Sequence, residues 1–276
     1  MQQKRLTDDP VKVSQITSGE HAGIERIEKQ VPHEVVQLAS RGIPYPEGHP
    51  LSTGVVKVRY MTARDEDILT TKSFIKNGTV FDELYKALLV DNIKYNDLLT
   101  VDRTSIMLAA RSLSYGAEYE VKVDTPSGNS QEVIINIDEL PQKDVDFSKY
   151  TKGQNVFMYT LPKSGVEVGF KLLTVGDEKQ IDARIKSWKK VKRTGELTAR
   201  LRQLIVSFDG ETNKGKIATF IDEELLAADS RALRDYIKSI QPGVDLEIEV
   251  TDEVSGDTFR SEVTFGFDLF YPDARI

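Results

Sequence analysis

The side chains best suited to general acid–base catalysis, the histidines, all lie near the start of the chain. His21, His33 and His49 are the only three histidines in 276 residues. A hydrolytic triad needs a histidine beside a nucleophile, although its members can be far apart in sequence. The chain has no Gly-x-Ser-x-Gly elbow to support one, and no glycine-rich phosphate loop. The pattern therefore favours surface or turn positions for these histidines.

Paired carboxylates are a second candidate for chemistry. Asp65–Glu66 and Asp177–Glu178 occur in similar surroundings, each pair following a threonine. Acids in the first turn of a helix complement its dipole by about 0.3–1 kcal/mol each. We therefore predict that both pairs stabilise helix N-termini, with Thr62 and Thr174 as N-caps.

One basic cluster surrounds the single tryptophan, Trp188. Its members are Arg184, Lys186, Lys189, Lys190, Lys192 and Arg193. Such a run is typical of a solvated helix face, and it also suits an acidic protein surface or nucleic acid. We keep Trp188, Lys189 and Lys190 as candidate partner-contact residues.

Composition excludes several classes of protein. The chain has no cysteine, which excludes disulfides, thiolate zinc sites and a cysteine nucleophile. The formal net charge is −7, from 37 basic and 44 acidic residues, and this balance argues against nucleic-acid binding, which needs excess cations. The start lacks a secretory apolar segment, and no stretch approaches the roughly 20 apolar residues that cross a bilayer. We predict no cofactor, no metal, no membrane partner, and synthesis in a cytosol-like compartment.

Two long segments of the chain share one order of sequence signals. The stretch 52–66 has a glycine, alternating apolar residues, and a threonine followed by acids, and the stretch 163–178 repeats that order. This pattern predicts a strand that runs into a helix. Apolar residues then recur every four positions in each copy, which indicates a helical face; they are Val80, Leu84 and Leu88 in the first copy and Leu197, Leu201 and Ile205 in the second.

The correspondence continues to the end of each segment. Asp102 and Asp229 each mark the predicted start of an Asp-capped helix, and these helices are predicted to end at Gly116 and Gly243. Alternating strands and a turn follow in both copies, as in Tyr119 to Val123. A unit of this length that occurs twice predicts a pair of duplicated domains rather than a solenoid.

The predicted fold class is α+β, with two tandem pseudo-repeated domains, each a small β-sheet with a hairpin plus helices. We place an extended N-terminal arm at 1–49, the first repeat at 50–141, a polar linker at 142–155 and the second repeat at 156–276. A helix is predicted within the arm at 32–40. The prolines of 43–50 exclude a helix or central strand there, so this segment is predicted to run over the first domain or a partner.

Several segments resemble one known family, the T4-type phage baseplate proteins. They are Gly42–Leu51, Met61–Leu69, Lys76–Thr79, Ile106–Arg111, Phe170–Thr174, Asp229–Arg234 and Phe267–Asp273. Family members are described as baseplate hub subunits or hub-assembly proteins of contractile-tailed phages. The resemblance covers the chain from about Val35, and its opening segment and Phe-Tyr-Pro-Asp ending are the more specific parts.

The sequence departs from the family in its two hairpin turns. Many members carry Cys-Pro-x-Cys-Gly there, a pattern suited to a zinc knuckle. The corresponding turns read Asp-Thr-Pro-Ser-Gly at 124–128 and Asp-Glu-Val-Ser-Gly at 252–256. Neither holds a thiolate, so turn chemistry and strand pairing must stabilise these hairpins instead.

The resemblance implies a non-enzymatic virion protein of the tail baseplate, in the hub region. Its implied partners are other baseplate and tail proteins in a large hetero-oligomeric ring assembly, after synthesis in the host cytoplasm. A hub-assembly chaperone absent from the mature virion and a tail-tip cell-wall hydrolase remain alternatives. The candidate contact residues, beyond those of the basic cluster, are Pro44, Tyr45, Pro46, Phe270, Tyr271 and Pro272; these could instead pack on their own domains.

Overall fold

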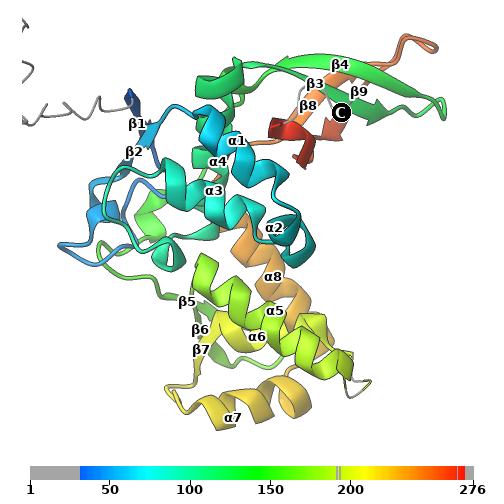
Figure 1. The fold of residues 1–276 in the computed structure, drawn as a ribbon. Helices are drawn as coiled ribbons and strands as arrows, with labels where there is room; N and C mark the ends of the chain where they lie inside the picture. The colour runs from blue at the N-terminus through cyan, green and yellow to red at the C-terminus, as the bar shows by residue number, and fades with distance from the viewer. Residues whose placement is uncertain (1–31, 191, 193, 266, 271–276) are drawn as a thin grey trace, which may run out of the picture. The chain divides into compact units, whose positions relative to one another are not determined.

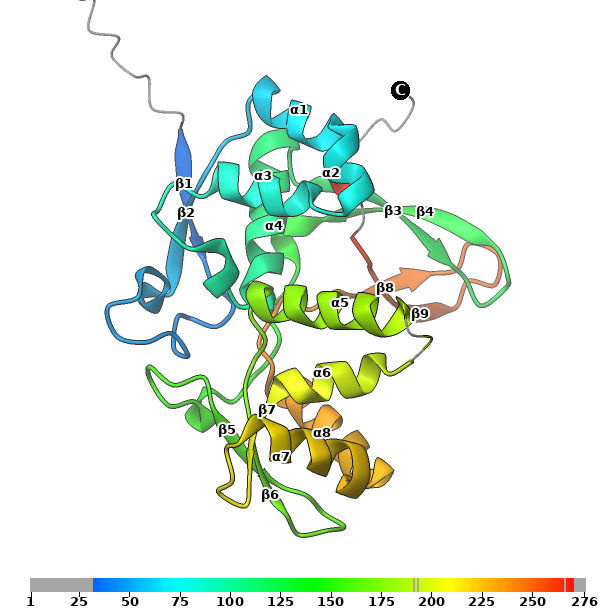
Figure 2. The ribbon, with the colours of Figure 1, turned by 60° about the horizontal axis from the view of Figure 1, so that its bottom comes forward.

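Helices and short antiparallel sheets make up the fold, which is α+β as predicted. The structure is a computed structural model that describes residues 32–190, 192, 194–265 and 267–270. Figures 1 and 2 show the elements from two sides. These residues belong to one compact unit, and their buried apolar side chains form one hydrophobic cluster.

All strand pairs in the described residues are antiparallel. The strands are β1 (His33–Gln37), β2 (Val55–Arg59), β3 (Glu118–Asp124), β4 (Ser130–Asn136), β5 (Phe157–Thr160), β6 (Glu167–Phe170), β7 (Ile205–Phe208), β8 (Glu247–Thr251) and β9 (Thr258–Glu262). β1 pairs with β2, β3 with β4 and β8 with β9, while β5, β6 and β7 form a three-stranded sheet in that order.

The described α-helices fall in two stretches of the chain, the first before the β3–β4 hairpin and the second before the β8–β9 hairpin. The first stretch holds α1 (Ala63–Thr70), α2 (Lys72–Asn77), α3 (Val80–Leu88) and α4 (Thr100–Tyr115), and the second holds α5 (Val175–Lys190), α6 (Glu196–Leu204), α7 (Lys214–Thr219) and α8 (Ala227–Ile240). Short 3₁₀ turns lie at Pro50–Thr53, Tyr95–Asp97, Ile137–Glu139, Phe147–Lys149 and Phe267–Phe270, and a π turn at Phe220–Glu224.

The alternating apolar residues at 119–123 form a strand and the apolar residues spaced by four at 80–88 form a helix, as predicted. Tyr119, Val121 and Val123 are buried on one face of β3, while the residues between them are exposed, because successive strand side chains point to opposite faces. Val80 and Leu84 are buried on α3. Leaving these apolar side chains in water would cost about 1.5–3 kcal/mol each, which fixes the inner face of each element.

The predicted helix at 32–40 is wrong, because this segment forms strand β1. Val35 and Val36 are β-branched and lose side-chain freedom in a helix, whereas they suit a strand. The strand pairs with β2 from His33 opposite Arg59 to Gln37 opposite Val55. Residues 33–37 of the predicted arm are therefore part of a sheet.

Two predicted helix boundaries in the second half also differ. The apolar series ending at Ile205 leaves the helix after Leu204, since Ile205 begins strand β7, and Leu197 is largely exposed. Helix α8 ends at Ile240 rather than at Gly243. Its counterpart α4 ends as predicted, with Gly116 at the C-cap and φ 88°.

The two hairpins, β3–β4 and β8–β9, lie side by side in both views (Figures 1 and 2). The Gln131 side chain donates to the Thr251 carbonyl at 2.9 Å and accepts from the Glu253 amide at 3.2 Å. The Ser127 amide donates to Asp252 at 3.2 Å. Both predicted hairpin turns therefore meet through ordinary hydrogen bonds.

Candidate interaction site

Asp102 is a buried carboxylate that ties the proline-rich segment to α4. Both the amide and the hydroxyl of Ser40 donate to it at 2.8 Å, and the Tyr45 hydroxyl donates at 2.7 Å. Tyr45 in turn accepts a hydrogen bond from the Leu99 amide at 2.9 Å. Burial raises the pKa of Asp102, although these hydrogen bonds oppose that effect. Burial and Asp102 also raise the pKa of Tyr45.

Asp229 occupies the corresponding place on α8. It is fully buried and accepts the backbone amides of Lys163 and Ser164 at 2.8 and 3.0 Å. Burial raises the pKa of Asp229, but the hydrogen bonds from Lys163 and Ser164 outweigh this effect and lower it. The prediction that both aspartates are N-caps is wrong, because Leu99 and Leu226 hold those positions. Each carboxylate instead binds a distant segment.

A second pair of aspartates begins α1 and α5. The backbone amide and hydroxyl of Thr62 both donate to Asp65 at 2.8 Å. Those of Thr174 both donate to Asp177 at 3.0 Å. A threonine followed three residues later by an acid is thus a capping arrangement at both helices, as the sequence predicted.

Each of these capping aspartates also pairs with a cation six residues earlier. Arg59 donates twice to Asp65, both at 2.7 Å, and Lys171 donates once to Asp177 at 2.8 Å. Burial raises the pKa of both carboxyls, but the hydrogen bonds from Arg59 or Lys171 and from the threonines prevail and lower it. These paired, saturated carboxylates have structural roles at the start of a helix.

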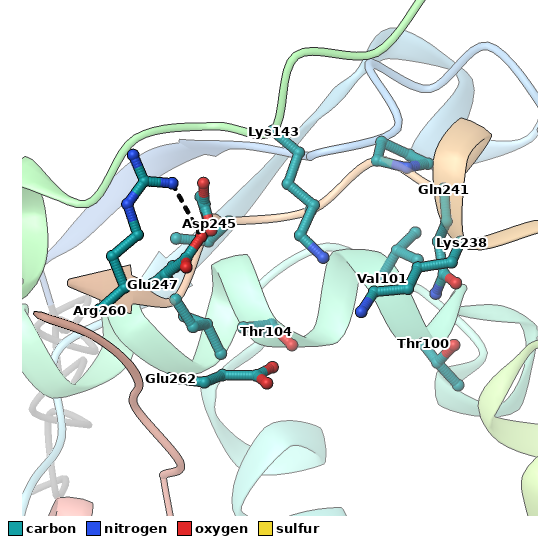
Figure 3. A pocket seen from close by; sticks show the side chains of 14 residues that line it. Thr100, Val101, Thr104, Lys143, Lys238, Gln241, Asp245, Glu247, Arg260 and Glu262 are labelled. Carbon is teal, nitrogen blue, oxygen red and sulfur yellow. Dashed lines mark hydrogen bonds and ion pairs between the residues drawn. The ribbon is translucent and has the colours of Figure 1, made fainter. Parts of the chain in front are cut away.

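A hollow of about 640 Å³ lies between α4, the end of α8 and strand β9 (Figure 3). Lys143 and Lys238 extend into the same part of it, and neither forms an ion pair within the described residues. Acidic side chains, including Glu262, lie on its other side, where Glu247 pairs with Arg260 at 3.7 Å. The hollow therefore has a cationic and an acidic end. Lys143 and Lys238 are far apart in sequence, and no sequence pattern indicated that they would lie together.

The basic cluster begins inside helix α5 and continues beyond it. Trp188 is half-buried, and the Arg202 guanidinium lies 5.6 Å from its ring centre. Lys189 is exposed and pairs with Glu196 at 3.3 Å. Lys190 is exposed and has no ion pair in the described part of the chain. The three candidates therefore lie together on the last turn of α5, with both lysines accessible to a partner.

The remaining predicted contact residues are divided between interior and surface. Pro44 and Tyr45 are buried against their own domain, whereas Pro46 is exposed. Phe270 is 1% exposed and lies against Phe81, with ring centres 6.0 Å apart. Tyr271 and Pro272 lie outside the described residues, as does the N-terminal part of the predicted arm, 1–31.

The described residues show neither a metal-binding cluster nor a membrane-spanning helix. No group of three or more His, Asp or Glu side chains there is arranged to hold a metal ion. None of the described helices is both long and apolar enough to span a bilayer.

Among known protein families, one matches the chain. The family described as T4 bacteriophage base plate protein matches residues 46–266. Neither a curated protein nor a solved structure matches the chain. The family match spans both pairs of buried aspartates and the basic cluster.

Proposed function

The chain belongs to the T4 bacteriophage base plate protein family, and we propose that it is a non-enzymatic structural component of the tail baseplate in the hub region. Family membership implies a phage protein that contacts other tail proteins in the virion. The finer assignment to the hub rests on the resemblance of Gly42–Leu51 and of the chain's ending to hub subunits.

The observation that carries the proposal is the use of the buried acids. Asp65, Asp102, Asp177 and Asp229 are each saturated by hydrogen bonds from their own chain. An acid or base catalyst needs a carboxyl that can exchange a proton with a substrate. Groups held in this way stabilise a scaffold, which supports a role carried by surfaces.

We also propose that the scaffold is a tandem duplication, with repeats at 50–141 and 156–276 joined by 142–155. The support is that four arrangements recur in both segments. Each segment has a strand followed by a threonine–aspartate cap, and a cation six residues before that aspartate. Each then has a long helix whose third residue is a buried aspartate, followed by a hairpin. Thr62 with Asp65 and Thr174 with Asp177 are the clearest instance.

A duplicated protein offers two related surfaces, which suits contacts with several neighbours in a hetero-oligomeric ring. The two copies here also bind one another. The Thr100 amide donates to the Leu173 carbonyl at 2.9 Å, and the Val175 amide donates to the Leu98 carbonyl at 2.8 Å. The arm of 1–49 would add contact area to such a ring.

Quantitative mass spectrometry of purified virions tests the proposal. A structural role predicts peptides of this protein at a constant copy number per tail. Their absence from virions, together with their presence in assembly intermediates, would identify a hub-assembly chaperone instead. Clearing of host peptidoglycan in a zymogram would contradict the non-enzymatic assignment.

A further inference from the structure

A small basic hollow lies between α5, α6, β7 and α7, apart from the hollow of Figure 3. Its volume is about 210 Å³, roughly the share of seven water molecules in the liquid. Four cationic side chains line it, with neutral amide, hydroxyl and apolar groups between them; the cations are Lys171, Arg184, Arg202 and Lys214. No carboxylate is among the lining residues.

Two of these four cations are already neutralised. Lys171 pairs with Asp177 at 2.8 Å, and Arg202 pairs with Asp222. The side chains of Arg184 and Lys214 have no ion pair or hydrogen bond within the described residues. Two uncompensated positive charges, from helices α5 and α7, therefore face one hollow in a protein whose net charge is −7.

Arg202 provides a second, independent observation. Its Nε–H is buried and has no acceptor within the described part of the chain. A buried donor without a partner costs about 1–3 kcal/mol, and more when the group is charged. An anion bound in the hollow would lie against the guanidinium of Arg202, which lines it, as well as against the two uncompensated cations.

We propose that this hollow is a carboxylate-binding site, which receives an Asp or Glu side chain from a neighbouring protein in the baseplate. The partner follows from the proposed structural function, on which this inference rests. The hollow has room for a single acidic side chain, and the overall negative charge repels the extended phosphate chain of a nucleic acid. Charge-assisted hydrogen bonds between guanidinium or ammonium groups and a carboxylate are among the stronger ones in proteins.

The basic cluster found in the sequence gains a specific role from this site. Arg184 lies one turn before Trp188 on α5, so the positive charge of the cluster continues from the exposed Lys190 into the hollow. Exposed lysines of this kind steer an acidic surface toward its docking position, while the cations in the hollow select the side chain that enters.

The single tryptophan gives a direct readout. Because Arg202 contacts both the hollow and the Trp188 ring, a bound anion changes the surroundings of the indole. We would titrate the full-length protein with an acetylated tetraglutamate peptide at low salt and follow Trp188 fluorescence. The proposal predicts saturable binding that weakens with added salt, and no response to tetraglutamine.

The test variant is Arg184→Glu/Lys214→Glu, and its matched control is Lys72→Glu/Lys152→Glu at exposed positions on α2 and in a loop. Each substitution replaces +1 by −1, so both double variants change the formal charge from −7 to −11. We expect the test variant to bind the peptide at least about ten-fold more weakly and the control to bind within about two-fold of wild type. If the test variant does not fold, Arg184→Gln/Lys214→Gln replaces it.

Further arms distinguish the sources of negative charge. Inorganic phosphate and an oligo-dT strand are titrated under the same conditions. The proposal would be overturned if phosphate or oligo-dT bound more tightly than tetraglutamate. It would also be overturned if the control variant lost as much affinity for tetraglutamate as the test variant, or if tetraglutamate did not bind to the wild-type protein.

The same variants are then supplied to a phage that lacks its own copy of the gene. Loss of incorporation into tails for the test variant, and normal incorporation for the control, supports the site. If the test variant enters tails as well as wild type, the site is wrong although the structural function stands. If the wild-type protein is also absent from tails, the proposed structural function is wrong. The proposed baseplate partner of the site is then wrong as well.

Discussion

The hydroxyl of Tyr45 donates a 2.7 Å hydrogen bond to the carboxylate of Asp102, 57 residues later in the chain. Both groups are buried, and the same hydroxyl accepts the Leu99 amide. Replacing Tyr45 by Phe keeps the ring but leaves the amide and one carboxylate lone pair without a partner. We expect the free energy of unfolding to fall by about 1–3 kcal/mol, as measured by urea denaturation.

The control for this prediction is Tyr60→Phe. Tyr60 follows β2, and within the described residues its hydroxyl makes only a long, exposed contact of 3.5 Å with Glu34. Its removal should change stability by less than about 0.5 kcal/mol. If the two variants lost equal amounts of unfolding free energy, the Tyr45–Asp102 hydrogen bond would contribute no more to stability than the exposed contact of Tyr60.

The Arg59–Asp65 and Lys171–Asp177 pairs can be compared by double-mutant cycles to alanine. Arg59 binds through two nitrogens, whereas Lys171 binds through one. We therefore expect a coupling energy of about 1–3 kcal/mol for the arginine pair and a smaller one of the same sign for the lysine pair. Coupling in only one of the two cycles would weaken the case for equivalent repeats.

Acid should destabilise the protein through its lowered carboxyl pKa values. The pKa of Asp252 is lowered to about 2 by hydrogen bonds from Ser127 and from the amides of its own turn. A lowered pKa means that the stabilising contribution is present above the ordinary carboxyl pKa and is lost as pH falls through the folded-state value. We expect unfolding free energy to decline from about pH 4 toward pH 2.

Asp252→Asn should flatten this acid decline, as followed by urea denaturation at several pH values. Asp67→Asn is the control, because the exposed Asp67 carboxylate makes no hydrogen bond within the described residues. Asp102 contributes with the opposite sign: its raised pKa favours the folded state at low pH, and that contribution is lost as pH rises through the folded-state value. If the unfolding free energy of Asp252→Asn declined between pH 4 and pH 2 as steeply as that of wild type, the prediction for Asp252 would be refuted.

Gly195 allows the chain to pass close to Trp188. Its φ is +150°, and a Cβ there would lie 3.0 Å from the indole Cζ3. Gly195→Ala should therefore lower stability by about 1–3 kcal/mol and shift Trp188 fluorescence. Gly243→Ala, where a Cβ meets nothing closer than 3.9 Å, should do neither.

Removal of residues 1–30 should leave the folded unit intact. Within the described residues, the buried apolar cluster begins at Leu38, and β1 begins at His33. We expect cooperative thermal unfolding within a few degrees of the full-length midpoint, because this cluster and β1 are kept, together with impaired tail assembly. A truncated protein that assembles tails normally would contradict an assembly role for the arm.

Much of this molecule follows from local sequence patterns. The alternation of Tyr119, Val121 and Val123 specifies a strand with one buried face, because side-chain direction in a strand depends only on position. Thr62 followed by Asp65, like Thr174 followed by Asp177, specifies a helix start, because the capping groups are three residues apart. The recurrence of these local signals is also the sequence basis of the proposed duplication.

Errors in the prediction arose where local signals are ambiguous. The segment at 32–40 has no period that separates a helix from an edge strand, and its partner β2 decided the outcome. Asp102 and Asp229 are of a residue type that often caps helices, yet each lies three positions beyond the N-cap and binds a segment more than 60 residues away. Tertiary pairing overrode propensity in both cases, because long-range hydrogen bonds in a dry interior outweigh small local preferences.

The sequence by itself therefore determined the family and the α+β class. It also determined the threonine caps of α1 and α5 and the hairpins, which depend on residues within a few positions of one another. Only the tertiary structure decided that Tyr45 is an interior residue and that Arg184 and Lys214, 30 positions apart, face one hollow. Such a hollow depends on how separate helices pack, and no short-range pattern in the chain encodes the distance between side chains from different elements.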